Sequence, residues 1–332
     1  MTDKYYIYFN NWWPGFFNGQ DKNNIEFFKQ LFNHTKLKNY EITNNLDIAN
    51  VLFEAGKPSD NILKSKKWKY TIIFTGEPVL PIYDKHNMVI NSLTKENYDN
   101  YEESIKKNID THNIGYIILD DEKILLDKHK YKKDKHLNLP GSIWYIIGNN
   151  YFSKLLNKPP IKIIPPNFCC FIVSNSKCHI RNKIFHELNK YKKVNSGGSY
   201  CNNIGRNVPG GWMSQNHLQF ISQHKFMICF ENSLFNHMTE KPVNAYLSNT
   251  IPIYWSSNFI KNIFNPNSML FLENTTNEGY KNLIEKVIEI DNDNNKYLKM
   301  ANEPIFTKEN INFWNENYSF ESLGKKINKI LL

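Results

Sequence analysis

The sequence lacks the features that mark several classes of protein. Five cysteines form no C-x-x-C pair and no even-numbered framework, so neither a disulfide scaffold nor a cysteine zinc site is indicated. No run of about twenty apolar residues offers a membrane-spanning helix, and the first residues carry no signal-peptide core. A complete G-x-G-x-x-G dinucleotide fingerprint is also missing. The sequence therefore predicts a globular protein with free thiols in a reducing cytoplasm.

Composition indicates an ordinary globular chain with an excess of positive charge. At 332 residues it is long enough for two domains, each with its own core. Hydrophobic residues make up 41% and charged residues 22%, and the formal net charge of +9 favours an anionic ligand. Nucleic acid or an acidic membrane surface would fit the same charge, so peripheral membrane contact stays open. Heavy use of Asn, Lys and Ile is typical of an AT-rich genome, so we expect the cytoplasm of a bacterium or of a virus-infected cell.

A unit of strand, loop, helix and strand organises the C-terminal half. Residues 225–230 have the apolar character of a buried strand, which ends at the polar residues Glu231 and Asn232. After a loop, Thr239 is a good N-cap for a short helix, and residues 250–255 form the next strand. The helix therefore begins beside the carboxyl end of a strand.

The start of this helix is a place where an α/β fold binds anions. Four N–H groups there lack backbone partners and together carry about half a positive charge, which suits a phosphate. Glu240 and Lys241 in the first turn add an acceptor and a cation. A nucleotide sugar needs both, one for its hydroxyls and one for its diphosphate. The alternative is a capped surface helix with an acid in its first turn.

A second anion-binding pattern comes earlier in the chain. Residues 168–173 predict a strand, and Arg181 stands in the opening turn of a helix over residues 180–190. A glycine-rich run with Gly197 and Gly198 would let the backbone approach a nucleotide, although alone it is a weak signal. The alternative for Arg181 is a place on a solvated helix face.

The loop after the first predicted strand, residues 5–9, is suited to a sugar. It presents Asn11, Trp12 and Trp13. The indole rings offer flat apolar faces on which a sugar can stack, and the amide offers donors and acceptors. The alternative is that one tryptophan belongs to the core.

A single acid follows another strand of the N-terminal half. Residues 47–53 and 70–74 predict strands, and the second ends at Thr75-Gly76-Glu77. A carboxylate presented there is well placed to act on a substrate hydroxyl. From the sequence alone, an exposed turn acid is the simpler explanation of Glu77.

Paired prolines at 159–160 and 165–166 interrupt helix and sheet and mark the best domain boundary. We expect an N-terminal domain over residues 1–157, a hinge over 158–167, a second domain over 168–318, and a last helix over 319–332 that returns to the first domain.

Asp291-Asn292-Asp293 has the D-x-D spacing of metal-dependent transferases. It lies in a polar run between two helical stretches, where a loop is the simpler interpretation. We therefore expect no metal site.

Three segments follow one another in the C-terminal half: Phe230-Glu231-Asn232-Ser233, Met238-Thr239-Glu240-Lys241 and Ile251-Pro252-Ile253-Tyr254-Trp255, with Ala245 between the last two. Together they resemble the signature of a known family, the α-1,3-fucosyltransferases that use GDP-fucose. The Asn-Trp-Trp triplet resembles the acceptor side of bacterial members. Thr75-Gly76-Glu77 is similar to the segment that carries the general base of the family. Two positions depart from the pattern, His237 before Thr-Glu-Lys and Ser256 after Tyr-Trp.

The resemblance implies a GT-B fold of two Rossmann-like domains facing across a cleft. It implies an inverting enzyme that moves fucose from GDP-fucose to an acceptor oligosaccharide, α-1,3 to GlcNAc or Glc, with Glu77 as general base. No cofactor is then required, and a divalent metal is stimulatory at most. The residues assigned to GDP-fucose are Arg181, Lys225, Glu231, Asn232, Glu240, Lys241, Gly197 and Gly198. Those assigned to the acceptor are Asn11, Trp12 and Trp13.

Two other functions remain open from the sequence. One is the same fold with a different nucleotide-deoxysugar donor, which the departures at His237 and Ser256 keep in view. The other is a non-catalytic protein that binds glycans or nucleic acid through its positive charge. The joint presence of Glu77, Arg181 and Lys241 argues against it, because a binding protein needs no base, and we expect no nucleic-acid partner.

Overall fold

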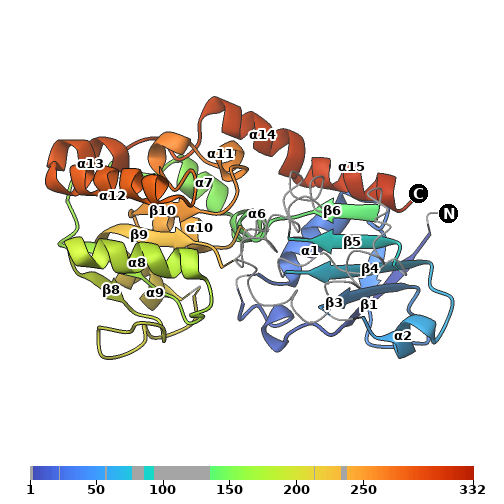
Figure 1. The fold of residues 1–332 in the computed structure, drawn as a ribbon. Coiled ribbons are helices and arrows are strands. Elements are labelled where there is room, and N and C mark those ends of the chain that lie inside the picture. The colour runs from blue at the N-terminus through green and yellow to red at the C-terminus, as the bar shows by residue number, and fades with distance from the viewer. Residues whose placement is uncertain are drawn as a thin grey trace. The chain divides into compact units, whose positions relative to one another are not determined.

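The computed structural model describes residues 3–21, 23–56, 58–76, 86–92, 135–212, 214–232 and 238–332. They divide into two compact units, each built around one sheet (Figure 1). Among the described residues, the first unit takes those of 3–92, 135–149 and 312–332, and the second takes those of 150–311. The second unit thus begins before the proline pairs, and the last helix belongs to the first unit.

The first unit has six described strands in one parallel sheet. In spatial order they are β2 (Tyr40–Ile42), β1 (Tyr5–Asn10), β3 (Val51–Ala55), β4 (Tyr70–Thr75), β5 (Met88–Asn91) and β6 (His136–Asn138). The described helices around it are η1 (Pro14–Phe16), α1 (Ile25–Asn33), α2 (Asp60–Lys64), α6 (Gly141–Gly148) and α15 (Phe320–Ile330). α15 packs against α1 and β6.

Aromatic side chains fill the core of the first unit. Phe53 of β3 contacts Phe9, Phe28 and Trp12 at ring-centroid distances of 4.9–5.2 Å. All five residues of β3 are buried, because helices and loops cover both faces of a parallel sheet.

The predicted strand over residues 47–53 begins too early. β3 starts at Val51, because the side chain of Asn45 accepts the Asp47 N–H at 3.0 Å and starts a turn. The apolar residues at 48 and 49 therefore belong to a turn and not to the strand.

The second unit has five described strands, again in one parallel sheet. In spatial order they are β11 (Leu270–Phe271), β10 (Ile251–Trp255), β9 (His224–Phe230), β7 (Asn167–Phe171) and β8 (Val194–Ser196). Its described helices are α7 (Tyr151–Leu156), α8 (His179–Tyr191), α9 (Gln215–Ile221), α10 (Lys241–Leu247), α11 (Ile260–Ile263), η3 (Pro266–Ser268), α12 (Asn277–Asn292) and α13 (Asn294–Ala301). α14 (Lys308–Tyr318) runs from the residues of this unit into those of the first.

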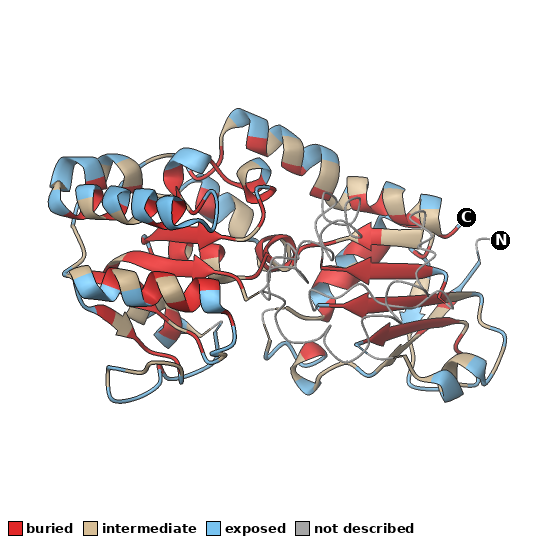
Figure 2. Ribbon diagram, in the orientation of Figure 1, coloured by how far each residue is buried: buried red, intermediate tan, exposed pale blue. Residues whose placement is uncertain are grey.

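Burial follows the layers of each unit. The central strands are buried, and the helices expose their outer faces (Figure 2). α8 buries Ile184 and Leu188, and α12 buries Val287. These side chains share one apolar cluster with Phe171 of β7 and Phe226 of β9. The predicted α/β class is confirmed, and each unit is built on one parallel sheet.

Candidate functional site

The carboxyl ends of β7 and β9 lie side by side, because the two strands pair in parallel. Loops at such an edge carry function in open α/β sheets. Glu231 follows β9, and Arg181 lies in the first turn of α8, the helix after β7. The Cys178 thiol donates to the backbone oxygen of Glu231 at 3.6 Å, which ties the start of α8 to the end of β9. We call this region, with the start of α10, the carboxyl edge of the second sheet.

Glu231 is the buried centre of the carboxyl edge. Its side chain is 0% exposed, and its Oε1 accepts the Thr239 N–H at 2.8 Å. The Thr239 hydroxyl lies 2.8 Å from Oε2, and the Lys241 ammonium donates to Oε2 at 2.9 Å. Glu231 therefore braces the loop between β9 and α10 and fixes Lys241.

Among the described residues, the Lys241 ammonium has acceptors for two of its three N–H groups, and the third is unused. Two of its three N–H groups are taken by Glu231, at 2.9 Å, and by Thr239 Oγ1, at 2.8 Å. Burial lowers the pKa of Lys241, but the carboxylates of Glu231 and Glu240 more than offset this, so its pKa lies above its ordinary value. The side chain is a fixed cation that can still donate to an anion.

Arg181 is buried beside this cation. Its residue is 2% exposed, its Nη2 donates to the Asn175 backbone oxygen at 2.7 Å, and its Nε has no acceptor among the described residues. Burial lowers the pKa of Arg181, and Cys178 and Glu231 oppose the shift. A buried guanidinium with an unused N–H is a strong site for an anionic oxygen.

Two acceptors complete the edge. The Oδ1 of Asn232 is buried without a partner among the described residues. Glu240 is half-buried, and its carboxylate has no hydrogen-bond or ion-pair partner in the described part of the chain. Glu240, not Thr239, is the N-cap of α10, and it is helical in backbone angles with no side-chain cap bond. The predicted helix start is thus one residue early, and the Glu240 carboxylate is left available to a ligand.

Sequence reasoning missed two neighbours of this edge. His217 of α9 is 7% exposed, and burial lowers its pKa while the nearby Glu240 raises it. Asn244 of α10 donates to the Trp212 backbone oxygen at 2.9 Å, which fixes the loop before α9. A lone histidine and a mid-helix asparagine match no sequence motif. Their place beside the carboxyl edge becomes visible only in the structure, where α9 packs on α10.

Gly197 and Gly198 are explained by contacts within the protein. A Cβ at Gly198 would lie 2.1 Å from the Val173 backbone oxygen, and a Cβ at Gly197 would lie 2.5 Å from Val208 Cγ2. Real Cβ atoms do not approach so closely. Gly198 faces backbone that cannot move aside and therefore requires glycine, whereas a side chain at position 197 would force the Val208 methyl group to shift. The structure gives a reason for these glycines that involves no nucleotide.

Lys225 stands at the other end of β9. Its ammonium donates to the Asp291 backbone oxygen and carboxylate, both at 2.9 Å. Lys225 and Glu231 are six residues apart on an extended strand, which is roughly 20 Å. We therefore leave Lys225 out of the ligand site and assign it to the ion pair with Asp291.

The Asp-Asn-Asp run is not the loop that was predicted: Asp291 and Asn292 end α12, and the extended residue Asp293 alone separates it from α13. Asp291 lies in the last turn of α12, and its buried carboxylate accepts from Lys225, from Lys192 at 3.1 Å and from the Tyr191 hydroxyl at 2.9 Å. Burial raises the pKa of Asp291, but these donors more than offset it and hold the pKa below its ordinary value. Asp293 caps α13. Both carboxylates thus have structural partners, and the described residues contain no cluster of metal-ligand type.

In the first unit the two tryptophans differ. Trp12 donates from Nε1 to the Phe53 backbone oxygen at 3.0 Å and stacks on Phe16 and Phe74, with centroids 4.0 and 5.4 Å away. Trp13 is half-buried, as Trp12 is, and its ring lies near those of Phe16 and Trp144, with centroids 5.2 and 6.0 Å away. The alternative reading, that one tryptophan is core, therefore applies to Trp12.

Asn11 is exposed in the same loop and has a positive φ of 61°, a conformation that asparagine tolerates well. Glu77 lies outside the described residues, as does the departure at His237.

The comparisons with known proteins also distinguish the second unit from the first. The profile for the C-terminal part of glycosyltransferase family 10 (fucosyltransferase) matches residues 166–328, which include every residue of the carboxyl edge. The C-terminal half of the chain belongs to this family. The alpha-(1,3)-fucosyltransferase FucT of Helicobacter pylori is 35% identical over 158 residues, which are 47% of this chain and 31% of that protein. The chain thus matches about a third of the length of that relative.

Solved structures extend the likeness to the whole fold. A crystal structure of an alpha1,3-fucosyltransferase is 22% identical, with a TM-score of 0.66 over 99% of this chain and 90% of that one. A structure of such an enzyme with GDP-fucose is 24% identical, with a TM-score of 0.60 over 100% of this chain and 91% of that one. The fold of these crystal structures, of the GT-B class, therefore extends over both units. In the described part of the chain, no helix has the length and apolar character to cross a membrane.

Proposed function

We propose that this family-10 protein transfers L-fucose from GDP-fucose to a hydroxyl of an acceptor glycan, with inversion at the anomeric carbon. The observation that supports this best is the set of unused polar groups at the carboxyl edge. Among the described residues, two cations, Arg181 and Lys241, each keep an unused N–H, and two acceptors, Glu240 and Asn232, each keep an unused oxygen. Donors for a diphosphate beside acceptors for hydroxyls match the chemistry of a nucleotide sugar.

The cations would stabilise the leaving group. When the glycosidic bond breaks, negative charge grows on the GDP diphosphate. Arg181 Nε and the third Lys241 N–H, fixed in advance and largely buried, would donate to its oxygens. Two fixed cations can serve the diphosphate without a metal, so we propose that a divalent cation is not required.

Glu240 and Asn232 would hold hydroxyls of the ribose or of the fucose. Glu231, whose oxygens are already occupied, would act through Lys241 and would not touch the donor. In the first unit, Asn11 and Trp13 are the remaining candidates for contact with the acceptor, since Trp12 packs against the core.

Glu77 would act as the general base. Its carboxylate would take the proton of the acceptor hydroxyl as that oxygen attacks the anomeric carbon in line with the leaving diphosphate. One displacement gives the inverted linkage, and no covalent intermediate forms. The proposal rests on the Thr75-Gly76-Glu77 segment of the sequence.

A transfer assay with labelled GDP-fucose and a panel of GlcNAc- and Glc-terminated acceptors tests this function. Glu77→Gln should keep GDP affinity and lose at least about a hundredfold in kcat, the typical contribution of a general base. Glu41→Gln, an exposed acid of β2 paired with Lys4, is the control and should stay fully active. An active Glu77→Gln enzyme would remove Glu77 as base. Transfer of another nucleotide deoxysugar in place of fucose would overturn the choice of donor.

A further inference from the structure

Glu54 is a buried acid inside the first sheet. It stands in β3, whose other four residues are apolar and buried, and its side chain is 0% exposed. Its Oε1 accepts the Asn10 Nδ2–H at 2.7 Å and the Ser59 N–H at 3.0 Å. The Nε2 of His86, a residue that is buried as well, lies 3.0 Å from Oε2. Both oxygens of Glu54 therefore have hydrogen-bond partners within the unit.

Stability alone does not account for an acid at this position. A buried carboxylate loses its hydration, and a well-packed apolar side chain in its place is often as stabilising or more so. The neighbours of Glu54 along β3 show that this part of the sheet accepts apolar side chains. What the acid adds is a fixed orientation for the groups that donate to it.

Asn10 is the donor to Glu54 that lies nearest to solvent. The two are register partners of the parallel pair β1–β3, so their side chains lie on the same face of the sheet. Because a carboxylate only accepts hydrogen bonds, the end of the Asn10 carboxamide that faces Glu54 must be Nδ2, and Oδ1 is directed elsewhere. Asn10 is half-buried, and its Oδ1 has no hydrogen-bond partner among the described residues. The result is an amide oxygen of fixed orientation on a partly exposed residue.

Asn10 lies where the proposed acceptor would bind. It is the last residue of β1, and the exposed Asn11 follows it. The strand order is β1, β3, β4, so the carboxyl ends of β1 and β4 are two strand spacings apart, roughly 10 Å. Thr75 ends β4, two positions before Glu77 in the sequence. An oligosaccharide that offers one hydroxyl to Glu77 can therefore present a second one to Asn10.

We propose that Asn10 is a specificity-determining residue for the acceptor: its Oδ1 accepts a hydrogen bond from a hydroxyl of the acceptor glycan. Glu54 is the positioning residue that holds the carboxamide in this orientation. The inference rests on the function proposed above and names a contact of its acceptor. An acceptor sugar that carries this hydroxyl is favoured over its deoxy analogue, which leaves Oδ1 without a donor.

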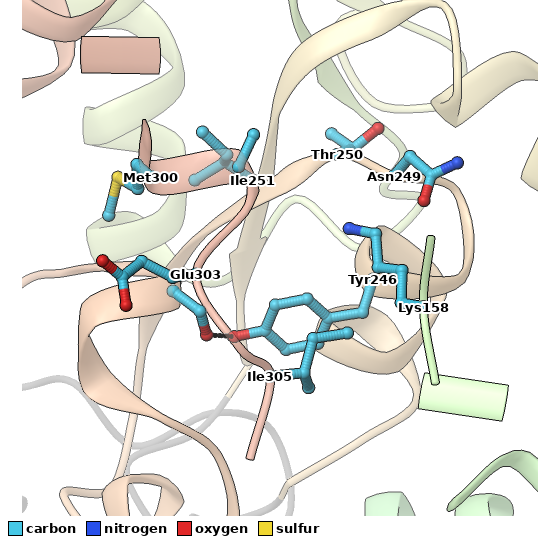
Figure 3. A pocket seen from close by; sticks show the side chains of 10 residues that line it. Lys158, Tyr246, Asn249, Thr250, Ile251, Met300, Glu303 and Ile305 are labelled. Carbon is cyan, nitrogen blue, oxygen red and sulfur yellow. Dashed lines mark hydrogen bonds between the residues drawn. The ribbon is translucent and has the colours of Figure 1, made fainter. Parts of the chain in front are cut away.

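The enclosed pocket of the second unit is too small to be an alternative place for a sugar. Figure 3 shows it beside Tyr246, Ile251 and Ile305, and its volume of about 10 Å³ has room for a single water molecule. The Tyr246 hydroxyl is bonded to Ser268 Oγ at 2.6 Å. A glycan therefore cannot enter there, in contrast to the edge of the first sheet at Asn10.

Steady-state kinetics of the full chain, with a GlcNAc- or Glc-terminated acceptor and its monodeoxy analogues, tests the contact. Asn10→Ala should raise the KM for the acceptor roughly 2- to 12-fold, the range for one neutral hydrogen bond, and leave kcat and the KM for GDP-fucose unchanged. One deoxy analogue should be a correspondingly poor acceptor for wild type, and wild type and Asn10→Ala should use it equally well. Asn33→Ala, exposed at the end of α1 that precedes β2, is the control and should match wild type.

Two variants test the role of Glu54. In Glu54→Gln the amide oxygen can still accept from Asn10 and Ser59, and the amide N–H can donate to the other tautomer of His86, so this variant should keep the acceptor KM near that of wild type. Glu54→Leu removes the acceptor of the Asn10 amide, so the acceptor KM should rise as it does in Asn10→Ala. Adding Asn10→Ala to Glu54→Leu should then have no further effect. An unchanged kcat shows that a variant is folded, and Asn10→Ala decides the contact even where Glu54→Leu does not fold.

Saturation-transfer NMR with the same glycans, without GDP-fucose, separates this inference from the proposed function. An Asn10→Ala enzyme with the acceptor KM of wild type, or a Glu54→Gln enzyme as impaired as Glu54→Leu, would overturn the inference and leave the function standing. Glycan binding that Asn10→Ala weakens, without any transfer of fucose by wild type, would support the Asn10 contact and overturn the function. Absence of both glycan binding and transfer in wild type would overturn both.

Discussion

The polar side chains of the carboxyl edge divide by whether partners already occupy them. Glu231 uses both oxygens on Thr239 and Lys241, so its work is internal. Arg181 Nε and Asn232 Oδ1 are buried without partners in the described part of the chain, an arrangement that costs stability unless a ligand completes it. This division, and not proximity alone, separates the residues proposed to touch GDP-fucose from the one that positions them.

Glu231→Gln is the sharpest test of that positioning role. The amide keeps the shape but leaves Lys241 without its buried counter-ion, so we expect a loss of about 3 kcal/mol in the free energy of unfolding. Urea unfolding measures this loss of stability. Calorimetry should in addition show weaker GDP binding, because Lys241 is no longer fixed.

Glu273→Gln is the matched control, because Glu273 also meets a lysine, Lys261, at 2.9 Å, but is 62% exposed. It should change the free energy of unfolding by less than about 1 kcal/mol. Equal losses in the two variants would contradict the special role of Glu231.

The sequence identified the residues of the edge better than their roles. Residue type and spacing single out Glu231, Glu240 and Lys241, but no pattern says which carboxylate faces inward. Lys225 shows the limit most clearly: it borders the same motif, yet it lies at the amino end of β9 and pairs with Asp291, a residue 66 positions away. Long-range partners of this kind are not written in local sequence.

At the scale of elements, most strands and helices could be predicted because their apolar periodicity is strong. β4, β9, β10 and α8 lie within one or two residues of their predicted bounds. The errors fall where a polar side chain competes for the backbone, as at the turn before β3, or where a helix starts without a side-chain cap, as at α10.

The turn after β8 gives a prediction at this scale. Gly198→Ala would press a methyl group against the backbone of Val173, 2.1 Å from its oxygen, and backbone atoms cannot move aside as a side chain can. We expect a loss of about 1–3 kcal/mol in the free energy of unfolding, the usual cost of overpacking, which urea unfolding measures.

Gly211→Ala is the control, since nothing lies within 4 Å of the added Cβ, and it should leave the stability within about 0.5 kcal/mol. If Gly198→Ala were as stable as wild type but bound GDP less well, the glycine would serve the nucleotide and not the packing of β7 against β8.

At the scale of the whole molecule, the fold consists of two α/β units, each with one parallel sheet. The likeness to the family is stronger in the second unit than in the first. The family profile covers residues 166–328, while the first unit is tied to the fucosyltransferases by structure at 22–24% identity. The side chains proposed to bind the donor all lie in the part of the chain that the family profile matches. The acceptor would be chosen by loops of the first unit, such as that of Asn11 and Trp13, which lie outside the part matched by the family profile.

Isothermal titration of the full chain with GDP-fucose, without metal and then with Mg²⁺, tests the central claim most directly. Wild type should bind without metal. In Arg181→Ala the binding free energy of GDP-fucose should weaken by about 1.5–3 kcal/mol, as expected for hydrogen bonds to a charged group. This corresponds to a Kd that is roughly 10- to 150-fold higher. Lys190→Ala, at the exposed far end of α8, should bind as wild type does. Absence of binding without metal, or an Arg181→Ala variant with unchanged affinity, would contradict a cation-lined GDP-fucose site at the carboxyl edge of the second sheet.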